Sequence, residues 1–130
     1  MDVLLSVKPK YVTSIMEGHK RYEFRKAIFR NRSVNRIFIY SSAPVQRIVA
    51  SFEIGTIIED NPSVLWNRVR DYAGIDDAEF FSYFAGRSRG YAIGIENLRE
   101  FDEPIDPKAV IPGFVPPQSY CYMDGLVVAE

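Results

Sequence analysis

One stretch decides the fold: Gly18-His19-Lys20-Arg21-Tyr22-Glu23-Phe24-Arg25. Gly18 is suited to end a helix, because glycine tolerates the left-handed backbone found just past a helix C-terminus. The residues after it alternate as in a β-strand, so that Glu23 and Arg25 share one face and the aromatic residues share the other. The stretch therefore predicts a helix followed at once by a strand whose polar face carries one carboxylate among several cations.

The elements on either side are predicted from periodicity and from proline and glycine. A helix is expected over 9–17, because Pro9 suits the first helical turn and apolar residues recur at helical spacing up to Met16. Helices are also expected over 62–73 and 77–85, each preceded by an N-cap residue, Asn61 or Asp76. Strands are expected over 3–7, 20–26, 36–41, 46–58, 90–101 and 121–128, with a bend or bulge at Gly55.

Five or six strands and about three helices in irregular order do not make a repeating βαβ pattern, and this favours an α+β fold with a curled β-barrel. The chain of 130 residues is 47% hydrophobic, which is enough for one domain spanning 1–130. It has no apolar run of the ~20 residues that a membrane helix requires, and its start does not resemble a signal peptide. With Cys121 as the single cysteine, we expect a cytoplasmic protein without a disulfide.

The charges are distributed unevenly along the chain. Residues 1–50 carry ten Lys or Arg against three Asp or Glu, a net charge of +7. Residues 51–130 carry six against fourteen, a net charge of −8. This asymmetry favours a basic face that binds nucleic acid, unless the two halves interleave in space and their charges pair.

The residues offer few catalytic or metal-binding patterns. One histidine and one cysteine cannot build the usual zinc site, and neither a Walker loop nor a GxGxxG or GxSxG motif is present. We therefore expect no metal and no cofactor.

The cluster of Lys20, Glu23 and Arg25 is more informative. On a regular strand Lys20 would point away from Glu23 and Arg25, so it joins them only from a turn after Gly18 or through a bulge. If it does, the carboxylate can accept a hydrogen bond from a nucleobase while the cations face phosphate or carbonyl oxygen. The alternative is a solvent-exposed strand face with modest ion pairs.

The chain resembles ASCH-domain proteins of the PUA-like superfamily, to which EVE- and YTH-type domains are related. The pattern Gly-x-Lys-x-x-Glu-x-Arg matches Gly18, Lys20, Glu23 and Arg25, and the segments 6–9, 40–44, 47–49 and 89–93 add to the likeness. The resemblance implies a PUA-like β-barrel that binds RNA or a modified nucleobase in a cleft beside the first helix. For one subgroup it also implies a role in transcriptional or translational regulation.

Eight residues are expected to bind the ligand. Glu23 would accept from the base edge, Arg25 would orient the base, and Lys8 and Lys20 would contact phosphate. The remaining candidates come from the turn at 40–44 and from the late loop at 116–120. The full set is Lys8, Lys20, Glu23, Arg25, Tyr40, Ser41, Ser119 and Tyr120.

Two other functions stay open. Small relatives that hydrolyse acetylcytidine use a lysine at the position of Lys20 and a threonine three residues later, where this chain has Glu23. Lys20 and Glu23 would be the catalytic residues of such an amidohydrolase. A carboxylate beside a lysine raises its pKa, however, and a lysine that acts as a base requires a lowered one. The other alternative is a protein-interaction module whose charged cleft holds the barrel together.

Overall fold

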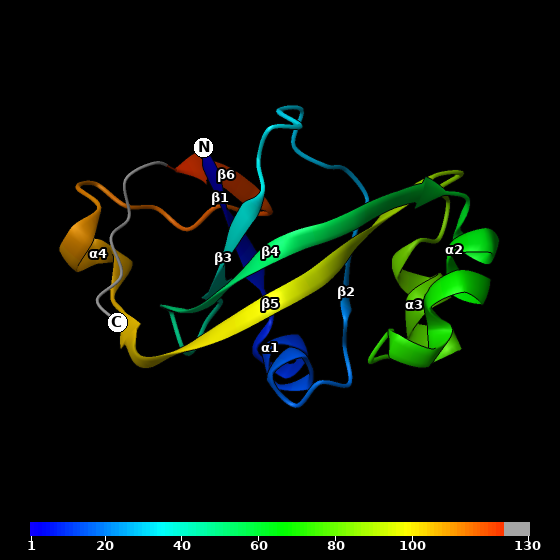
Figure 1. Cartoon of the computed structure of the whole chain (residues 1–130), viewed down its shortest axis with the longest axis horizontal. Helices are drawn as coiled ribbons and strands as arrows, with labels where there is room; N and C mark the ends of the chain where they lie inside the picture. The colour runs from blue at the N-terminus through cyan, green and yellow to red at the C-terminus, as the bar shows by residue number, and fades with distance from the viewer. Residues whose placement is uncertain (124–130) are drawn as a thin grey trace.

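The computed structural model describes residues 1–123 as one mixed sheet with short helices around it (Figure 1). The strands are β1 (Asp2–Val7), β2 (Tyr22–Arg25), β3 (Arg36–Ser41), β4 (Arg47–Asp60), β5 (Gly90–Ile105) and β6 (Tyr120–Met123). The helices are α1 (Pro9–Met16), α2 (Pro62–Val69), the 3-10 turn η1 (Arg70–Tyr72), α3 (Asp77–Tyr83) and α4 (Pro107–Val110). The strand order is β2-β5-β4-β3-β1-β6, in which β1 and β3 are parallel and the other neighbours antiparallel.

The sheet is curled but not closed, so the predicted β-barrel is wrong, although the α+β class is confirmed. Within the described residues β2 pairs only with β5, and β6 only with β1, so the sheet keeps two edges. A side chain crosses the open side of the sheet, because Arg25 Nη2 of β2 donates to the Ser6 carbonyl near the end of β1 at 2.5 Å. We call this opening between β2 and β1 the seam.

The longest feature is the ribbon of β4 and β5, which carries α2 and α3 at one end (Figure 1). Its register shifts three times, and Gly55 lies in the shift between Ile54 and Ile57, where the sequence predicts a bulge. A Cβ at Gly55 would lie only 2.6 Å from the carboxylate of the exposed Glu96, so a larger residue here would require that side chain to move. Such irregularities increase the twist of a sheet and help to turn the ribbon.

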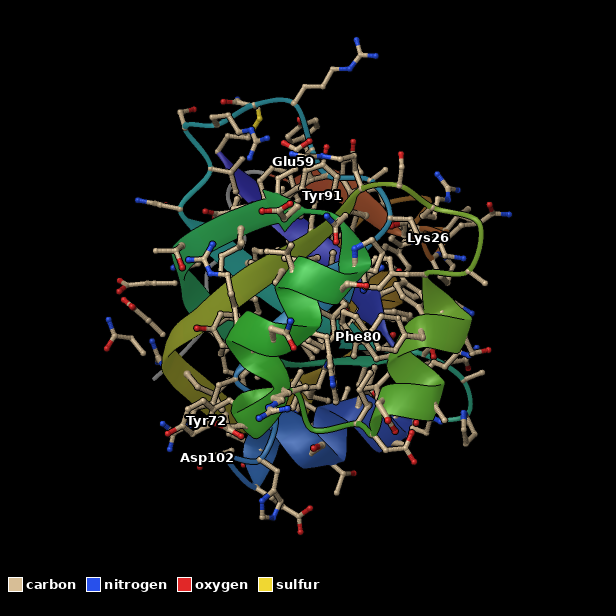
Figure 2. All side chains as sticks on the ribbon, turned by 90° about the vertical axis from the view of Figure 1, so that its right-hand side faces the viewer. Lys26, Glu59, Tyr72, Phe80, Tyr91 and Asp102 are labelled. Atoms are coloured by element: carbon tan, nitrogen blue, oxygen red, sulfur yellow. The ribbon has the colours of Figure 1, made fainter. Side chains whose placement is uncertain are left out.

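An aromatic cluster fixes α2 and α3 against β2. Phe80 is fully buried and lies between the two helices (Figure 2). Its ring packs edge-on against Phe24 of β2, with 5.0 Å between the ring centroids, and contacts Trp66 of α2 at 4.9 Å. Since Phe24 faces this cluster, its neighbours Glu23 and Arg25 point to the opposite face of β2.

The predicted elements are found with some changes in their bounds. Both predicted N-caps are confirmed: Asn61 accepts from Val64 N and Asp76 accepts from Glu79 N. β2 is shorter than predicted because Lys20 lies in a turn, where it forms an isolated bridge with Ala73. The short helix α4 was not predicted, and residues 124–128 of the predicted last strand lie outside the described residues.

None of the helices in residues 1–123 is long and apolar enough to cross a membrane.

Candidate functional site

A cavity of about 680 Å³ opens at the seam, between β2, α1 and the loop before β6. This volume is within the range of roughly 300–1,000 Å³ that is typical of small-molecule sites. Its lining includes four cations from the N-terminal half of the chain and a single carboxylate, Glu23. The polar lining residues are Ser6, Lys8, Tyr11, Lys20, Glu23, Arg25, Lys26, Tyr40, Ser42, Gln46, Tyr83, Gln118 and Ser119.

Six of the eight candidate residues from the sequence line this cavity: Lys8, Lys20, Glu23, Arg25, Tyr40 and Ser119. The other two do not. Ser41 is buried in the β3 ladder opposite Val7, and the ring of Tyr120 packs against Phe29. Tyr40 and Ser41 are successive residues of β3 and point to opposite faces of the sheet, and of the two only Tyr40 lines the cavity.

The turn after α1 brings Lys20 next to Glu23 and Arg25, which was the condition for these three side chains to form one cluster. Gly18 adopts a φ of +82° just past the end of α1. The Lys20 N–H then donates to the carbonyl of Ser14 at 3.1 Å, and β2 begins two residues later. As a result, Lys20 Nζ lies 3.8 Å from Glu23 Oε1.

Lys20 lies at the floor of the cavity, with only 2% of its side chain exposed. Its Nζ donates to the carbonyl of Ala73 at 3.3 Å and lies 4.3 Å from the centroid of the Phe24 ring. Burial lowers the Lys20 pKa, Glu23 opposes this, and Arg25 lowers it further. Glu23 does act to raise the Lys20 pKa, as expected for a neighbouring carboxylate, but desolvation outweighs this attraction and the net shift is downward.

Arg25 is largely committed to holding the seam together. Its Nε and Nη2 donate to Glu23 Oε2 at 3.1 and 2.8 Å. Its Nη1 donates to Ser119 Oγ at 3.2 Å, in addition to the bond from Nη2 to the Ser6 carbonyl. The guanidinium thus joins β2, β1 and the loop before β6. This arrangement suits a positioning residue better than one that orients a base directly.

The two carboxylate oxygens of Glu23 have different surroundings. Oε2 accepts both bonds from Arg25, whereas Oε1 has no partner within hydrogen-bond distance in the described residues. Every fully buried side-chain nitrogen or oxygen of residues 1–123 has a hydrogen-bond partner. Oε1 must therefore be open to the cavity, although the residue as a whole is only 5% exposed. An acceptor in a buried setting with no bond of its own is what a ligand N–H requires.

The wall opposite the seam comes from α1 and α3. The Tyr11 hydroxyl donates to Glu79 of α3, and burial together with this bond raises the Tyr11 pKa. Tyr83 of α3 also lines the cavity, and Lys26 Nζ lies 4.8 Å from its ring centroid. Neither Lys26 nor Tyr83 was predicted from the sequence as a site residue. Lys26 directly follows the signature stretch, whereas nothing local distinguishes Tyr83 from a packing residue of its helix.

A curated protein and two solved structures are similar to this chain over most of its length. A curated protein of Zymomonas mobilis named ASCH domain-containing ribonuclease is 27% identical over 128 residues, which cover 94% of this chain and 84% of that protein. The crystal structure of ASCH from Zymomonas mobilis matches with a TM-score of 0.84 and 26% identity, over 94% of this chain and 87% of that one. A tyrosine-to-phenylalanine variant of that protein matches with a TM-score of 0.85 and 24% identity, over 94% and 89%.

These likenesses confirm the predicted resemblance to ASCH-domain proteins. Residues 1–114 also match a family model whose description is "Domain of unknown function (DUF365)". Because this match covers most of the chain, the protein belongs to the DUF365 family, and its fold is that of the ASCH-domain structures.

Proposed function

We propose that the protein binds RNA and that the cavity takes up one unpaired or modified nucleobase. The observation that carries this proposal is Glu23 Oε1, which is open to the cavity, accepts no hydrogen bond from the described residues and lies 3.8 Å from Lys20 Nζ. A nucleobase edge presents an N–H beside a carbonyl oxygen or ring nitrogen, which matches this acceptor and donor. The name of the ribonuclease relative and the four cations of the cavity support RNA as the ligand.

The aromatic lining supports the same ligand class. Tyr11, Phe24 and Tyr83 all line the cavity, and protein aromatic rings commonly stack on unpaired RNA bases. In this proposal Glu23 accepts from the base and Lys20 donates to it. Lys20 is buried at the floor and therefore faces the base, not the phosphate, and Arg25 holds Glu23 in place.

The test compares Glu23→Gln with the wild type. In the variant, the amide oxygen can keep the bonds from Arg25, and the amide nitrogen then faces the cavity as a donor. A hydrogen bond to a charged group contributes about 1.5–3 kcal/mol, so affinity should fall by roughly 10- to 150-fold. A thermal-shift screen of modified nucleosides and short single-stranded RNAs selects the probe, and fluorescence anisotropy at about 50 mM salt measures affinity.

Glu17→Gln is the matched control, because it makes the same change at an exposed carboxylate at the end of α1. Its affinity should equal that of the wild type. Equal binding by Glu23→Gln would refute the role of Glu23, and a lack of RNA binding by the wild type would refute the proposed function. Binding to RNA should also weaken with salt, by a slope that reflects a few phosphate contacts.

Hydrolysis of the bound RNA or nucleoside is the second candidate function. Two observations favour it: the lowered pKa of Lys20 and the ribonuclease name of the relative. A lysine with a lowered pKa is neutral more often near pH 7 and can then accept a proton. Incubation of each bound RNA or nucleoside with the wild type and with Lys20→Met, followed by product analysis, separates the two functions. Products from the wild type alone establish catalysis, and intact ligand with both proteins leaves recognition alone.

A further inference from the structure

The mouth of the cavity carries two cations that base recognition does not use. Lys8 and Lys26 line the cavity, and both are exposed. Among residues 1–123 neither forms an ion pair with a carboxylate, whereas Lys10 pairs with Glu79 at 2.9 Å. Lys26 lies beside α3 in Figure 2, where its Nζ approaches the Tyr83 ring. The mouth thus holds two positive charges that no described acid neutralises.

The backbone adds to this positive charge. Lys8 is the N-cap residue of α1, and no side chain caps that helix end. Pro9 follows, and the first turn contains no acidic residue. The helix dipole gives this end a partial positive charge that favours anions. Because Tyr11 N and Val12 N already donate to the Lys8 carbonyl and Pro9 has no N–H, the Lys10 N–H is the donor that this turn leaves for an anion. Since Lys8 and Tyr11 both line the cavity, this end of α1 lies at the cavity.

Glu23 Oε1 in the same cavity is independent evidence that a ligand belongs there. It accepts no hydrogen bond from the described residues, its nearest cation is Lys20 Nζ at 3.8 Å, and the residue as a whole is only 5% exposed. With Glu23 as the single carboxylate against Lys8, Lys20, Arg25 and Lys26, the lining favours a ligand that carries negative charge. A neutral nucleobase or nucleoside would leave this excess unmatched.

We infer that Lys8, Lys26 and the N-terminus of α1 form a phosphate subsite, so that the ligand is a nucleotide unit with its phosphate and not a free nucleobase or nucleoside. The inference rests on the proposed function, because it assigns the base to Glu23 and Lys20 at the floor. The phosphate then lies at the mouth, where its charge remains partly hydrated.

Calorimetric titration with the common ribonucleosides and their 5′- and 3′-monophosphates tests this inference. For the base that binds best, one monophosphate should bind about tenfold or more tightly than its nucleoside, a difference of about 1.4 kcal/mol. The double variant Lys8→Ala/Lys26→Ala should bind that monophosphate no better than the nucleoside. Lys108→Ala, which removes an exposed lysine of α4, is the matched control and should behave as the wild type.

The outcomes separate the two proposals. Equal affinity for nucleoside and monophosphate overturns the phosphate subsite and leaves base recognition standing. Equal weakening of both ligands by the double variant does the same. If only longer RNA binds, the subsite as described is also overturned. If neither nucleosides, monophosphates nor RNA bind, both the subsite and the proposed function are wrong.

Discussion

Replacement of Arg25 by methionine should destabilise the protein strongly, because this side chain closes the seam. Arg25 makes four hydrogen bonds, two to Glu23 and one each to Ser6 and Ser119. Its side chain is 11% exposed and that of Glu23 is 7% exposed, so the pair is largely shielded from water. Removal of one partner from a buried pair costs about 3–5 kcal/mol, because the other charge is left without compensation.

Urea unfolding at pH 7 measures this loss directly. For a chain of this length the expected cost corresponds to a fall in melting temperature of about 10–20 °C. Arg30→Met is the matched control, since Arg30 is exposed and forms no ion pair with the rest of residues 1–123. It should change the free energy of unfolding by no more than about 0.5 kcal/mol.

A double-mutant cycle tests the reason for the loss. The variant Glu23→Gln/Arg25→Met removes both charges, so it should be more stable than the sum of the single changes predicts, by about 1–3 kcal/mol. A cost below about 1 kcal/mol for Arg25→Met would refute the structural role of this residue. Additivity within about 0.5 kcal/mol would show that the Glu23–Arg25 pair does not couple.

Two further predictions concern Lys20 and its surroundings. Burial lowers the Lys20 pKa in the folded protein below its ordinary value of 10.5. At a pH between the lowered pKa and 10.5 the unfolded chain therefore binds more protons than the folded protein. As pH rises through this window, the wild type should gain stability relative to Lys20→Met. Urea unfolding over this pH range measures the difference in unfolding free energy between the two proteins. Burial raises the pKa values of Tyr11 and Tyr83, which has the opposite effect on stability, but this effect is present in both proteins and largely cancels in the difference. Unfolding free energies that change with pH in parallel in the two proteins would contradict the prediction. Gly74→Ala should destabilise by at least about 1 kcal/mol more than Gly86→Ala. Both glycines have positive φ, but a Cβ at Gly74 would lie 2.4 Å from Lys20 Cβ, whereas Gly86 has nothing within 4 Å. Equal unfolding free energies for the two variants would show that Lys20 yields to the methyl group without cost.

Local residue patterns were enough to predict most elements of this fold. Pro9 and Gly18 bound the first helix, and Asn61 and Asp76 cap the next two, because these residues act on the backbone within one turn of themselves. Alternation likewise placed Glu23 and Arg25 on one face of β2. The helix ends and the polar face of the signature strand were therefore determined by the sequence alone.

The bounds of the longer strands depended on pairing. β4 and β5 extend past their predicted ends, to Asp60 and Ile105, because each continues as long as the other supplies hydrogen bonds. The predicted closure into a barrel failed for a related reason. Closure requires a ladder between two particular edges, and strand propensity does not specify which edges meet.

Tertiary structure alone decided how the site is assembled. The sequence identified the Glu23 carboxylate, but Arg25 determines which of its two oxygens is hydrogen-bonded and which faces the cavity. Hydrogen bonds to Ser6 and Ser119 in turn hold the Arg25 side chain in place. Lys20 has a lowered pKa because the fold removes it from water, an effect that can oppose and outweigh a neighbouring charge. Tyr83 reaches the cavity through the packing of α3 on β2, across more than fifty residues of chain. Sequence patterns report what a residue does to its neighbours along the chain, whereas desolvation and long-range contacts exist only once the chain has folded.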